Sequence, residues 1–405
     1  VEEATRDPAV RKMLGNPYAL NPEGARKGPR QPGSVPVTYD RDAGSWTAPF
    51  VMAAINTRVV RRSAALMAAE LAGDPVGLGH AHLGAQLLQH LRSRWLHRPH
   101  KDAEQVRFHY DLCDDFYALW LDPMRVYSCA YYERSDMSLA QAQEAKLEHI
   151  CRKLQLQPGQ LLLDVGAGWG GLLLWAAEHH GVHAMGITLS RDQHAHVNRL
   201  IDKKGLRDRV TMRLLDYRDL PPTARFDRIA SVGMFEHVGS AQLDDYFGRL
   251  QRLLKPGGLL LNHGITAGGI DNHQLGAGLG DFIEKHIFPG GELVHVSRVA
   301  RSLSGNGLEL LDAENLRPHY ARTLRAWSDA LESQIDRARE LTSEATVRAY
   351  RLYLAGCAVA FERGWISIHQ LLASRPSGQV NDTELPGAQS VYPFNRRHMY
   401  TPAHA

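Results

Sequence analysis

The chain has 405 residues, of which 44% are hydrophobic, 22% are charged and 8% are aromatic, and its formal net charge is +3. This composition excludes a largely disordered chain and allows a core large enough for one or two domains. No apolar run approaches the roughly 18 residues of a membrane span, and no charged start followed by an apolar run indicates a secretory signal.

The chain contains four scattered cysteines, Cys113, Cys129, Cys151 and Cys357. They form no Cys-x-x-Cys pair, so we expect no metal site. Scattered thiols in a chain of this length are typical of a reducing compartment, which predicts a cytoplasmic protein. We expect no nucleic-acid partner.

The first 100 residues are the basic part of the chain, with 13 Lys+Arg and 8 Asp+Glu. Residues 1–46 are rich in proline and predict an extended arm. Residues 47–72 and 81–98 have helical patterns, and the second carries Leu83 to Trp95 on one face beside several arginines. Such a helix can lie on an anionic membrane surface, or its apolar face can pack on the next domain. We therefore expect residues 1–100 to form a separate region, with dimerisation and lipid access open as its roles.

From residue 158 the pattern alternates between strands and helices. The expected strands are 161–165, 183–188, 210–216, 226–232 and 258–263. This alternation predicts an α/β fold with a doubly wound, mainly parallel sheet, whose ligands bind at the carboxyl ends of the strands. Residues 320–372 are expected to form a helical cap, which gives a domain over 101–373. Residues 374–405 are expected to be an irregular tail.

A glycine-rich turn follows the first of these strands and precedes a helix. Within residues 163–171, Gly166, Gly168 and Gly171 fit the pattern G-x-G-x-x-G, and Gly170 belongs to the same turn. Glycines let the backbone approach a ligand closely, and the helix N-terminus then faces it. The turn alone does not separate NAD from S-adenosylmethionine.

Two features favour S-adenosylmethionine. A dinucleotide fold needs an acid about 20 residues after the turn to hold the ribose, and residues 186–190 contain none. Asp164 precedes the turn and Asp216-Tyr217 follows the third strand, which suits a methyltransferase pocket with Tyr217 against adenine. Asp164 as a turn-capping residue remains open at this point, and so does an NAD-type oxidoreductase.

Several polar side chains fall where the strand ends should converge. Glu236 and His237 follow the fourth strand, His263 follows the fifth, Cys129 lies upstream, and Tyr320 begins the helical cap. Each residue alone also has an ordinary explanation, because a lone His or Cys is typical of a core position and a lone Glu is typical of the surface. Their joint placement at the ligand-binding edge indicates an active site.

Six motifs then occur in a characteristic order. They are His109-Tyr110-Asp111 with Asp115-Phe116-Tyr117, Tyr127-Ser128-Cys129, the glycine turn, Thr188-Leu189-Ser190 with Gln193, Met234-Phe235-Glu236-His237, and Phe282-Ile283 with Ile287-Phe288-Pro289-Gly290-Gly291. On these motifs, residues 104–372 resemble the cyclopropane fatty acid synthase family, including its mycolic acid branch.

The resemblance implies a class I S-adenosylmethionine methyltransferase with a Rossmann-like sheet. It implies methyl transfer to the cis double bond of an unsaturated phospholipid acyl chain at a membrane surface, giving a cyclopropane ring. The family binds S-adenosylmethionine through positions matching Tyr127, Ser128, Gly166, Gly168, Thr188, Leu189, Gln193, Tyr217 and Arg218. It holds bicarbonate, taken as the base, through positions matching Cys129, Glu236, His263, Tyr320 and the backbone around Ile265. Cys357 matches a cysteine once taken as catalytic, although no histidine partner is visible to make it a thiolate.

The chemistry that the resemblance implies suits these residue types. Methyl transfer to an alkene leaves a carbocation, which aromatic faces can stabilise, and Tyr110, Phe116, Tyr117 and Phe235 are candidates. Glu236 is expected to accept a hydrogen bond from bicarbonate, while His263 and Tyr320 donate to it.

The N-terminal segment departs from the family. Residues 16–20 and 46–62 resemble the C-terminal part of saccharopine-dehydrogenase-like enoyl reductases. The same cation can also lose a different proton and leave a methylene branch, which would then need a separate reductase as partner. We keep the cyclopropane product first, with the methylene-branched product, an oxidoreductase and a non-catalytic lipid-binding protein as alternatives.

Overall fold

A computed structural model describes residues 38–40, 45–47, 114–269, 279–288, 291–377, 379–380, 383–384, 393 and 395–400. The chain divides into two compact units, residues 1–86 and 87–405. In the first unit, strands β1 (Thr38–Asp40) and β2 (Ser45–Thr47) pair antiparallel. The helices expected over 47–72 and 81–98 lie outside the described residues.

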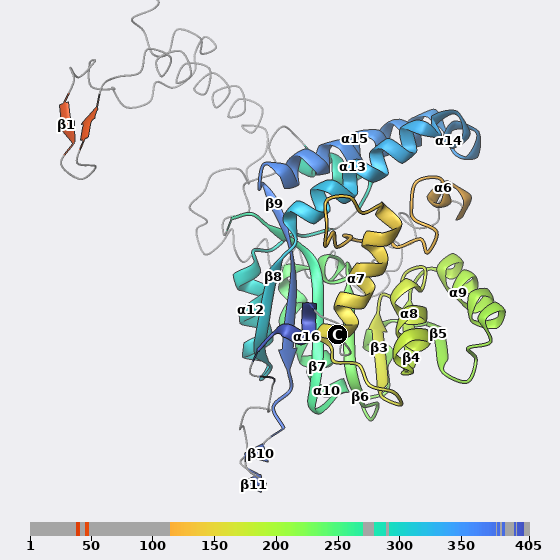
Figure 1. Cartoon of the computed structure of the whole chain (residues 1–405), viewed down its shortest axis with the longest axis vertical. Coiled ribbons are helices and arrows are strands. Elements are labelled where there is room, and N and C mark those ends of the chain that lie inside the picture. Colours follow the sequence, from red (N-terminus) through yellow and green to blue (C-terminus); the bar gives the residue numbers. More distant parts are fainter. Residues whose placement is uncertain are drawn as a thin grey trace, which may run out of the picture. The chain divides into compact units, whose positions relative to one another are not determined.

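The second unit is built on a seven-stranded sheet with the order β5-β4-β3-β6-β7-β9-β8 (Figure 1). The first five strands in this order are parallel, and β9 pairs antiparallel with both β7 and β8. The strands are β3 (Leu161–Val165), β4 (His183–Thr188), β5 (Val210–Leu214), β6 (Phe226–Val232), β7 (Leu254–Ala267), β8 (Glu309–Asn315) and β9 (Ile366–Ser374). The expected α/β fold with a doubly wound sheet and a helical cap is confirmed.

Helices cover both faces of this sheet. Neighbouring strand residues point to opposite faces, so Leu162 packs in one apolar cluster and Leu163 in another. The first cluster includes residues of α7 (Leu139–Lys153), α8 (Gly171–His180) and α9 (Arg191–Lys204). The second includes residues of α10 (Leu243–Leu253) and α12 (Val296–Gly305). The sheet is thus the middle of three layers, and its central strands are long apolar runs because both faces are buried.

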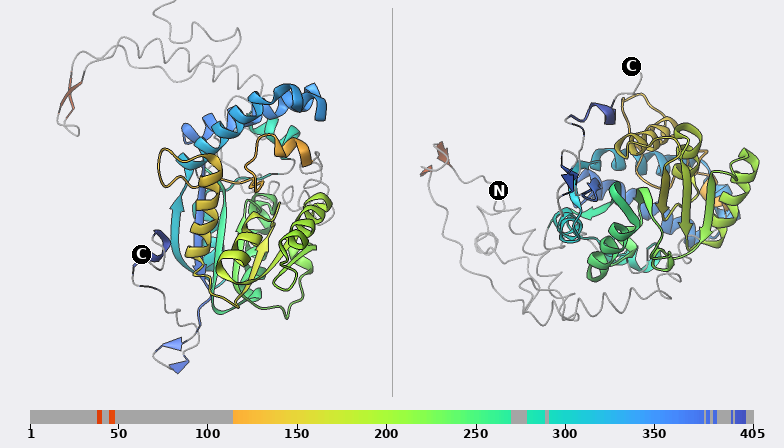
Figure 2. Two further views of the ribbon diagram at one scale, coloured as in Figure 1. Left: turned by 45° about the vertical axis from the view of Figure 1, so that its right-hand side comes forward. Right: turned by 90° about the horizontal axis from the view of Figure 1, so that it is seen from below.

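A third apolar cluster underlies the helical cap. It joins α6 (Asp114–Ala118), α13 (Arg317–Ser333), α14 (Ile335–Leu341) and α15 (Glu344–Glu362). Figure 2 shows α13 and α15 side by side at one end of the sheet, near the carboxyl ends of the parallel strands. Helix α11 (Leu279–His286) also contacts α15.

The sheet corrects several expected boundaries. Residues 366–372, expected to be helical, belong to β9, which is buried between β7 and β8. Gly364 ends the preceding helical run with a φ of 70°, which only glycine adopts readily. Strand β7 extends over 254–267 rather than 258–263, so His263 lies inside a strand and not after it.

The tail expected to be irregular contains regular structure. Strands β10 (Gln379–Val380) and β11 (Thr383–Glu384) pair antiparallel, and α16 (Arg397–Tyr400) follows. Met399 of α16 is fully buried in the cluster that contains α7. Among the described residues, no helix is long and apolar enough to cross a membrane.

Candidate active site

The glycine turn after β3 brings bare backbone to the edge of a cavity. Gly166, Gly168 and Gly170 have φ values of 80°, 54° and 84°, a region that L side chains rarely adopt. Gly170 is the residue that precedes α8, and a Cβ there would lie 2.9 Å from Val197 Cγ2. The turn therefore places the first amides of α8 next to the cavity without intervening side chains.

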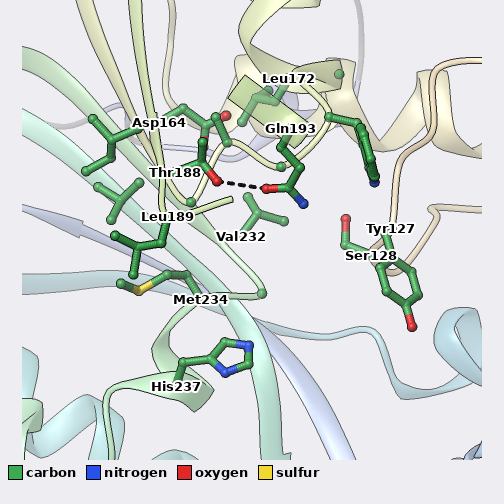
Figure 3. A pocket seen from close by; sticks show the side chains of 18 of the residues that line it. Tyr127, Ser128, Asp164, Leu172, Thr188, Leu189, Gln193, Val232, Met234 and His237 are labelled. Atoms are coloured by element: carbon green, nitrogen blue, oxygen red, sulfur yellow. Dashed lines mark hydrogen bonds between the residues drawn. The ribbon is translucent and has the colours of Figure 1, made fainter. Parts of the chain in front are cut away.

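This first cavity, here called the cofactor cavity, has a volume of about 140 Å³. Figure 3 shows residues of β3, of α8, of β4, of α9 and of the loop before α7 around one space. Nine cofactor-binding positions expected from the resemblance line it, together with Asp164: Tyr127, Ser128, Gly166, Gly168, Thr188, Leu189, Gln193, Tyr217 and Arg218. Gly170 does not line the cavity. It is the N-cap residue of α8.

A short hydrogen-bond chain fixes one wall of the cofactor cavity. Thr188 Oγ1 donates to Gln193 Oε1 over 2.8 Å and accepts from the Ser190 backbone N–H over 3.1 Å. The Gln193 amide oxygen is thereby occupied, and its nitrogen points towards the open side of the cavity in Figure 3. Gln193 is thus held as a hydrogen-bond donor to a ligand.

Two oppositely charged side chains line the same cavity deep in the protein. Asp164 is 2% exposed, and its Oδ1 accepts no hydrogen bond from any described residue. Burial raises the pKa of Asp164 to about 7. Lys146 of α7 is 1% exposed and donates to Ser128 Oγ over 2.9 Å, and burial lowers its pKa to about 8. Lys146 was not predicted as a site residue, although a lysine on the apolar stripe of a helix, beside Leu147 and Ile150, indicates a buried charge.

Tyr217 and Arg218 line another part of the cofactor cavity. Arg218 bonds the Asp216 carboxylate through Nε at 2.9 Å and Nη2 at 2.5 Å, and its guanidinium lies 5.4 Å from the Tyr217 ring centre. Tyr217 also packs edge-on against Tyr246, with 5.1 Å between ring centres. The Tyr217 ring is therefore held between two partners on the cavity wall.

A second cavity, here called the acyl cavity after the substrate that the sequence resemblance implies, has a volume of about 410 Å³. Six residues singled out from the sequence line it, although they come from separate segments: Cys129, Glu236, His263, Ile265, Tyr320 and Cys357. Most of the remaining wall is aliphatic or aromatic: Ile283, Phe288, Leu293, Leu324, Tyr353, Phe361, Trp365, Ile366 and Ile368. The structure therefore gathers the polar candidates in one mainly apolar space.

Glu236 is placed by the close approach of β7. Its Oε1 accepts from the Ile265 backbone N–H over 2.7 Å, while its Oε2 accepts no hydrogen bond within the described part of the chain. A Cβ on Gly264 would lie 2.1 Å from Phe235 Cε1 and 2.9 Å from Glu236 Oε1, so this contact requires glycine there. Burial raises the pKa of Glu236 to about 7. The Ile265 amide thus holds Glu236.

His263 is fully buried and acts as a neutral donor. Gln370 lies opposite it on β9, and the Gln370 amide nitrogen donates to His263 Nδ1 over 3.1 Å. The ring proton must then sit on Nε2, which has no partner among the described residues. Burial, together with Lys146 and Lys153, lowers the pKa of His263 well below its usual value. An uncharged imidazole therefore offers one N–H in the cavity.

The two cysteines of the acyl cavity are thiols. Cys129 Sγ donates to the Ala130 carbonyl over 3.2 Å, and burial raises the pKa of the Cys129 thiol. Burial also raises the pKa of Cys357 to about 12. Neither is a thiolate near neutral pH, so neither offers a basic sulfur.

The aromatic faces around the acyl cavity differ from those expected. Phe116, Tyr117 and Phe235 are buried but do not line either cavity, and Tyr110 lies outside the described residues. The aromatic lining consists instead of Tyr127, Phe288, Tyr320, Tyr353, Phe361 and Trp365. The difference arises because α15 turns its own aromatic side chains towards the cavity, which α6 does not reach.

The two cavities share a wall. Tyr127, Ser128, Gly233 and His237 line both of them. The Tyr127 hydroxyl donates to the Tyr353 hydroxyl over 3.3 Å, which ties this wall to α15. A group transferred from a ligand in one cavity to a ligand in the other would pass beside these four residues.

Comparisons with known proteins agree with this arrangement. Residues 97–371 match the family model described as mycolic acid cyclopropane synthetase. A probable fatty acid methyltransferase of Pseudomonas putida is 50% identical over 280 residues, which cover 69% of this chain and 71% of that protein. Cyclopropane mycolic acid synthase 1 of Mycobacterium tuberculosis is 41% identical over 290 residues, covering 69% and 98%.

A solved relative shares the fold. The crystal structure of mycolic acid cyclopropane synthase CmaA1, complexed with SAH and CTAB, is 40% identical with a TM-score of 0.65 and covers 68% of this chain and 99% of that one. The oxidoreductase and the non-catalytic alternatives are thereby set aside. The reductase-like resemblance of residues 16–20 and 46–62 lies before the matched region and stays a prediction. This chain is an S-adenosylmethionine-dependent methyltransferase and belongs to the mycolic acid cyclopropane synthetase family.

Proposed function

We propose that the enzyme transfers the methyl group of S-adenosylmethionine to the cis double bond of an unsaturated phospholipid acyl chain and closes a cyclopropane ring. One observation carries the proposal: a large apolar cavity with buried polar groups shares a wall with the cofactor cavity. An acyl chain suits such a lining, because each buried CH₂ contributes about 0.8 kcal/mol. The names of the relatives, which refer to fatty acids and mycolic acids, support the same substrate class.

The shared wall would position the first step. An alkene is a weak nucleophile, so the sulfonium methyl must be held in line with it. The methyl–sulfur bond breaks as the new carbon–carbon bond forms, and the positive charge moves to the acyl chain. Tyr127, Tyr320 and Tyr353 present rings on the acyl-cavity wall that would stabilise this charge. The apolar lining would exclude water, which would otherwise add to the cation.

The second step needs a base, and the polar groups of the acyl cavity suit bicarbonate. His263 Nε2 and Glu236 Oε2 are both buried and without partners in the described structure. A small anion that carries one proton can accept from His263 and Tyr320 and donate to Glu236. When bound, bicarbonate would supply the base for a proton of the new methyl group, and ring closure would follow. Cys129 and Cys357 are unsuited to that task because both are thiols.

Product analysis tests the proposal. The full chain would be incubated with S-adenosylmethionine and vesicles of a monounsaturated phospholipid, and the released fatty acids examined by mass spectrometry and proton NMR. We expect a gain of one CH₂, loss of olefinic protons and new high-field ring protons. Protons of a terminal methylene would instead establish the branched product and the need for a separate reductase. No gain on several lipids would overturn the substrate assignment.

A second measurement tests bicarbonate. In buffer freed of carbon dioxide, turnover should fall and recover on addition of bicarbonate, while the affinity for S-adenosylhomocysteine stays constant. Turnover that does not respond to bicarbonate would remove this anion from the mechanism. Sedimentation of the enzyme with the same vesicles would test the expected peripheral association with a lipid surface.

A further inference from the structure

Lys146 is a buried amine that forms no ion pair with the described residues, although Asp122 and Asp164 act on it from a longer distance. Its Nζ donates to the neutral Ser128 hydroxyl, and no carboxylate of the described residues forms an ion pair with it. Lys153, two turns later on α7, is equally buried but lies 2.5 Å from Glu314 Oε2 and 3.5 Å from Asp312 Oδ2. A buried charge is costly unless it is paired. Lys153 forms direct ion pairs within the protein, whereas Lys146 lines the cofactor cavity and forms none.

Asp164 presents the opposite case on the same cavity. It is a buried carboxyl group with an oxygen that accepts no hydrogen bond from the described residues, and it too lines the cofactor cavity. The cavity therefore contains one buried acidic and one buried basic side chain, and neither forms an ion pair there. A ligand that carries a carboxylate and an ammonium group would compensate both at once.

We propose that Lys146, together with the Ser128 hydroxyl that it holds, binds the carboxylate of the amino-acid part of S-adenosylmethionine, with Asp164 facing the ammonium group. Gln143 of the same helix supports this arrangement, because its Nε2 donates to the carbonyl groups of Val126 and Ser128 over 3.1 and 2.9 Å. Helix α7 thus holds both the backbone and the side chain of Ser128.

The same contact would also orient the methyl group. Ser128 lies on the wall that the two cavities share. A carboxylate fixed at Ser128 and Lys146 anchors one end of the cofactor. Tyr217 and Gln193 line the part of the cavity that would hold the rest of the cofactor. The sulfonium between these ends is then held beside the acyl cavity. The inference requires that the site binds S-adenosylmethionine, and it does not depend on which lipid is methylated.

Calorimetric titration of the full chain with two ligands tests the inference. One ligand is S-adenosylhomocysteine, and the other is its decarboxylated form, which keeps the amine. The wild-type protein should bind the decarboxylated ligand about 10- to 100-fold more weakly, the range of a charge-assisted hydrogen bond. Lys146→Met should lose about the same factor for S-adenosylhomocysteine and little for the decarboxylated ligand. Equal weakening of both ligands, or of neither, would overturn the proposal.

Two further variants keep the result interpretable. Lys153→Met removes the compensated lysine of the same helix and should lower stability without changing the ratio of the two affinities. Lys146→Gln keeps a donor for Ser128 but removes the charge, so it should also lose the discrimination between the ligands. Wild-type discrimination in Lys146→Gln would show that the charge is not used. No lipid is present in these titrations, so a wrong lipid assignment would leave their outcome unchanged.

Discussion

The two cavities of this enzyme are assembled in different ways. The cofactor cavity is built largely from short segments at the carboxyl ends of parallel strands, and several of its polar groups bond one another, as Thr188 and Gln193 do, while Asp164 keeps one oxygen without a partner in the described structure. The acyl cavity draws its wall from segments between residues 127 and 368, and it leaves Glu236 Oε2 and His263 Nε2 without partners in the described structure. The first arrangement suits binding. The second keeps polar groups available for a reaction.

The largest effect should come from Glu236→Gln. The amide keeps the size of the side chain but cannot act as the carboxylate that our mechanism requires, so turnover should fall about 10²- to 10⁴-fold. The affinity for S-adenosylhomocysteine should stay within about twofold, because Glu236 does not line the cofactor cavity. Methyl transfer rates and calorimetry would measure the two quantities.

A matched control for this variant lies on the same wall. Glu292→Gln changes a carboxyl group whose Oε2 already accepts from the Ser240 backbone N–H. Its turnover should fall by less than about tenfold, the scale of one ordinary hydrogen bond. Equal losses of turnover in both variants would mean that the enzyme is sensitive to any altered carboxyl group of the acyl cavity. This result would contradict a specific role of Glu236 in the mechanism.

The next effect concerns stability and pH. Burial raises the pKa of Glu236 from 4.5 to about 7, so the folded protein holds this proton more tightly than the unfolded chain does. The protonated Glu236 carboxyl group therefore stabilises the folded state by about 3 kcal/mol below pH 4.5, and this contribution to the free energy of unfolding is lost as the pH rises to 7. The stability of Glu236→Gln relative to wild type should increase by about this amount between pH 4.5 and 8.

Denaturant unfolding at several pH values measures this difference. Asp164 also has a raised pKa, but it is present in both proteins and cancels from the comparison. Glu340→Gln, which changes an exposed carboxyl group, should show no such trend. A constant difference between Glu236→Gln and wild type would mean that Glu236 ionises normally in the folded state.

A smaller effect is expected in the cofactor cavity. Gln193→Ala removes one donor from a wall that keeps many other contacts, so the affinity for S-adenosylhomocysteine should fall about 3- to 10-fold. The maximal rate at saturating cofactor should change little. Asp192→Asn, an exposed neighbour on α9, is the control. A large loss of maximal rate in Gln193→Ala would contradict the division between binding and reacting cavities.

The smallest effect should come from Cys357→Ala. Burial raises the pKa of this thiol to about 12, so it contributes apolar surface rather than a base. Turnover should stay within about threefold of wild type, and the fold should lose roughly 1 kcal/mol through the small cavity left behind. A 100-fold or larger loss of turnover would show that Cys357 takes part in the reaction and would weaken the role assigned to Glu236.

The cofactor cavity could be predicted from the sequence to a greater extent than the acyl cavity. Its glycine turn and strand ends follow from local backbone rules, and ten of the eleven predicted cofactor-binding positions line it, all except Gly170. Lys146 was missed because helical periodicity marks a buried face without saying which ligand or residue that face meets.

The acyl cavity depended on the resemblance, since no local rule joins Cys129 to Tyr320. The prediction of its aromatic lining was wrong. Tyr353 and Phe361 of α15 line the cavity, and the orientation of this helix is decided by tertiary packing and not by its sequence pattern. Strands β8 and β9 were also missed. The first is a polar edge strand, and the second is an apolar run that directly follows a 19-residue helix.

The docking of α16 has a consequence for how this protein is made. His149 Nδ1 lies 3.1 Å from the Met399 carbonyl oxygen, and 250 positions separate the two residues. The apolar face of α7 beside them is therefore synthesised long before the residue that covers it. During translation the part of this face that Met399 covers would stay open to other chains and to chaperones until residues 397–400 are synthesised.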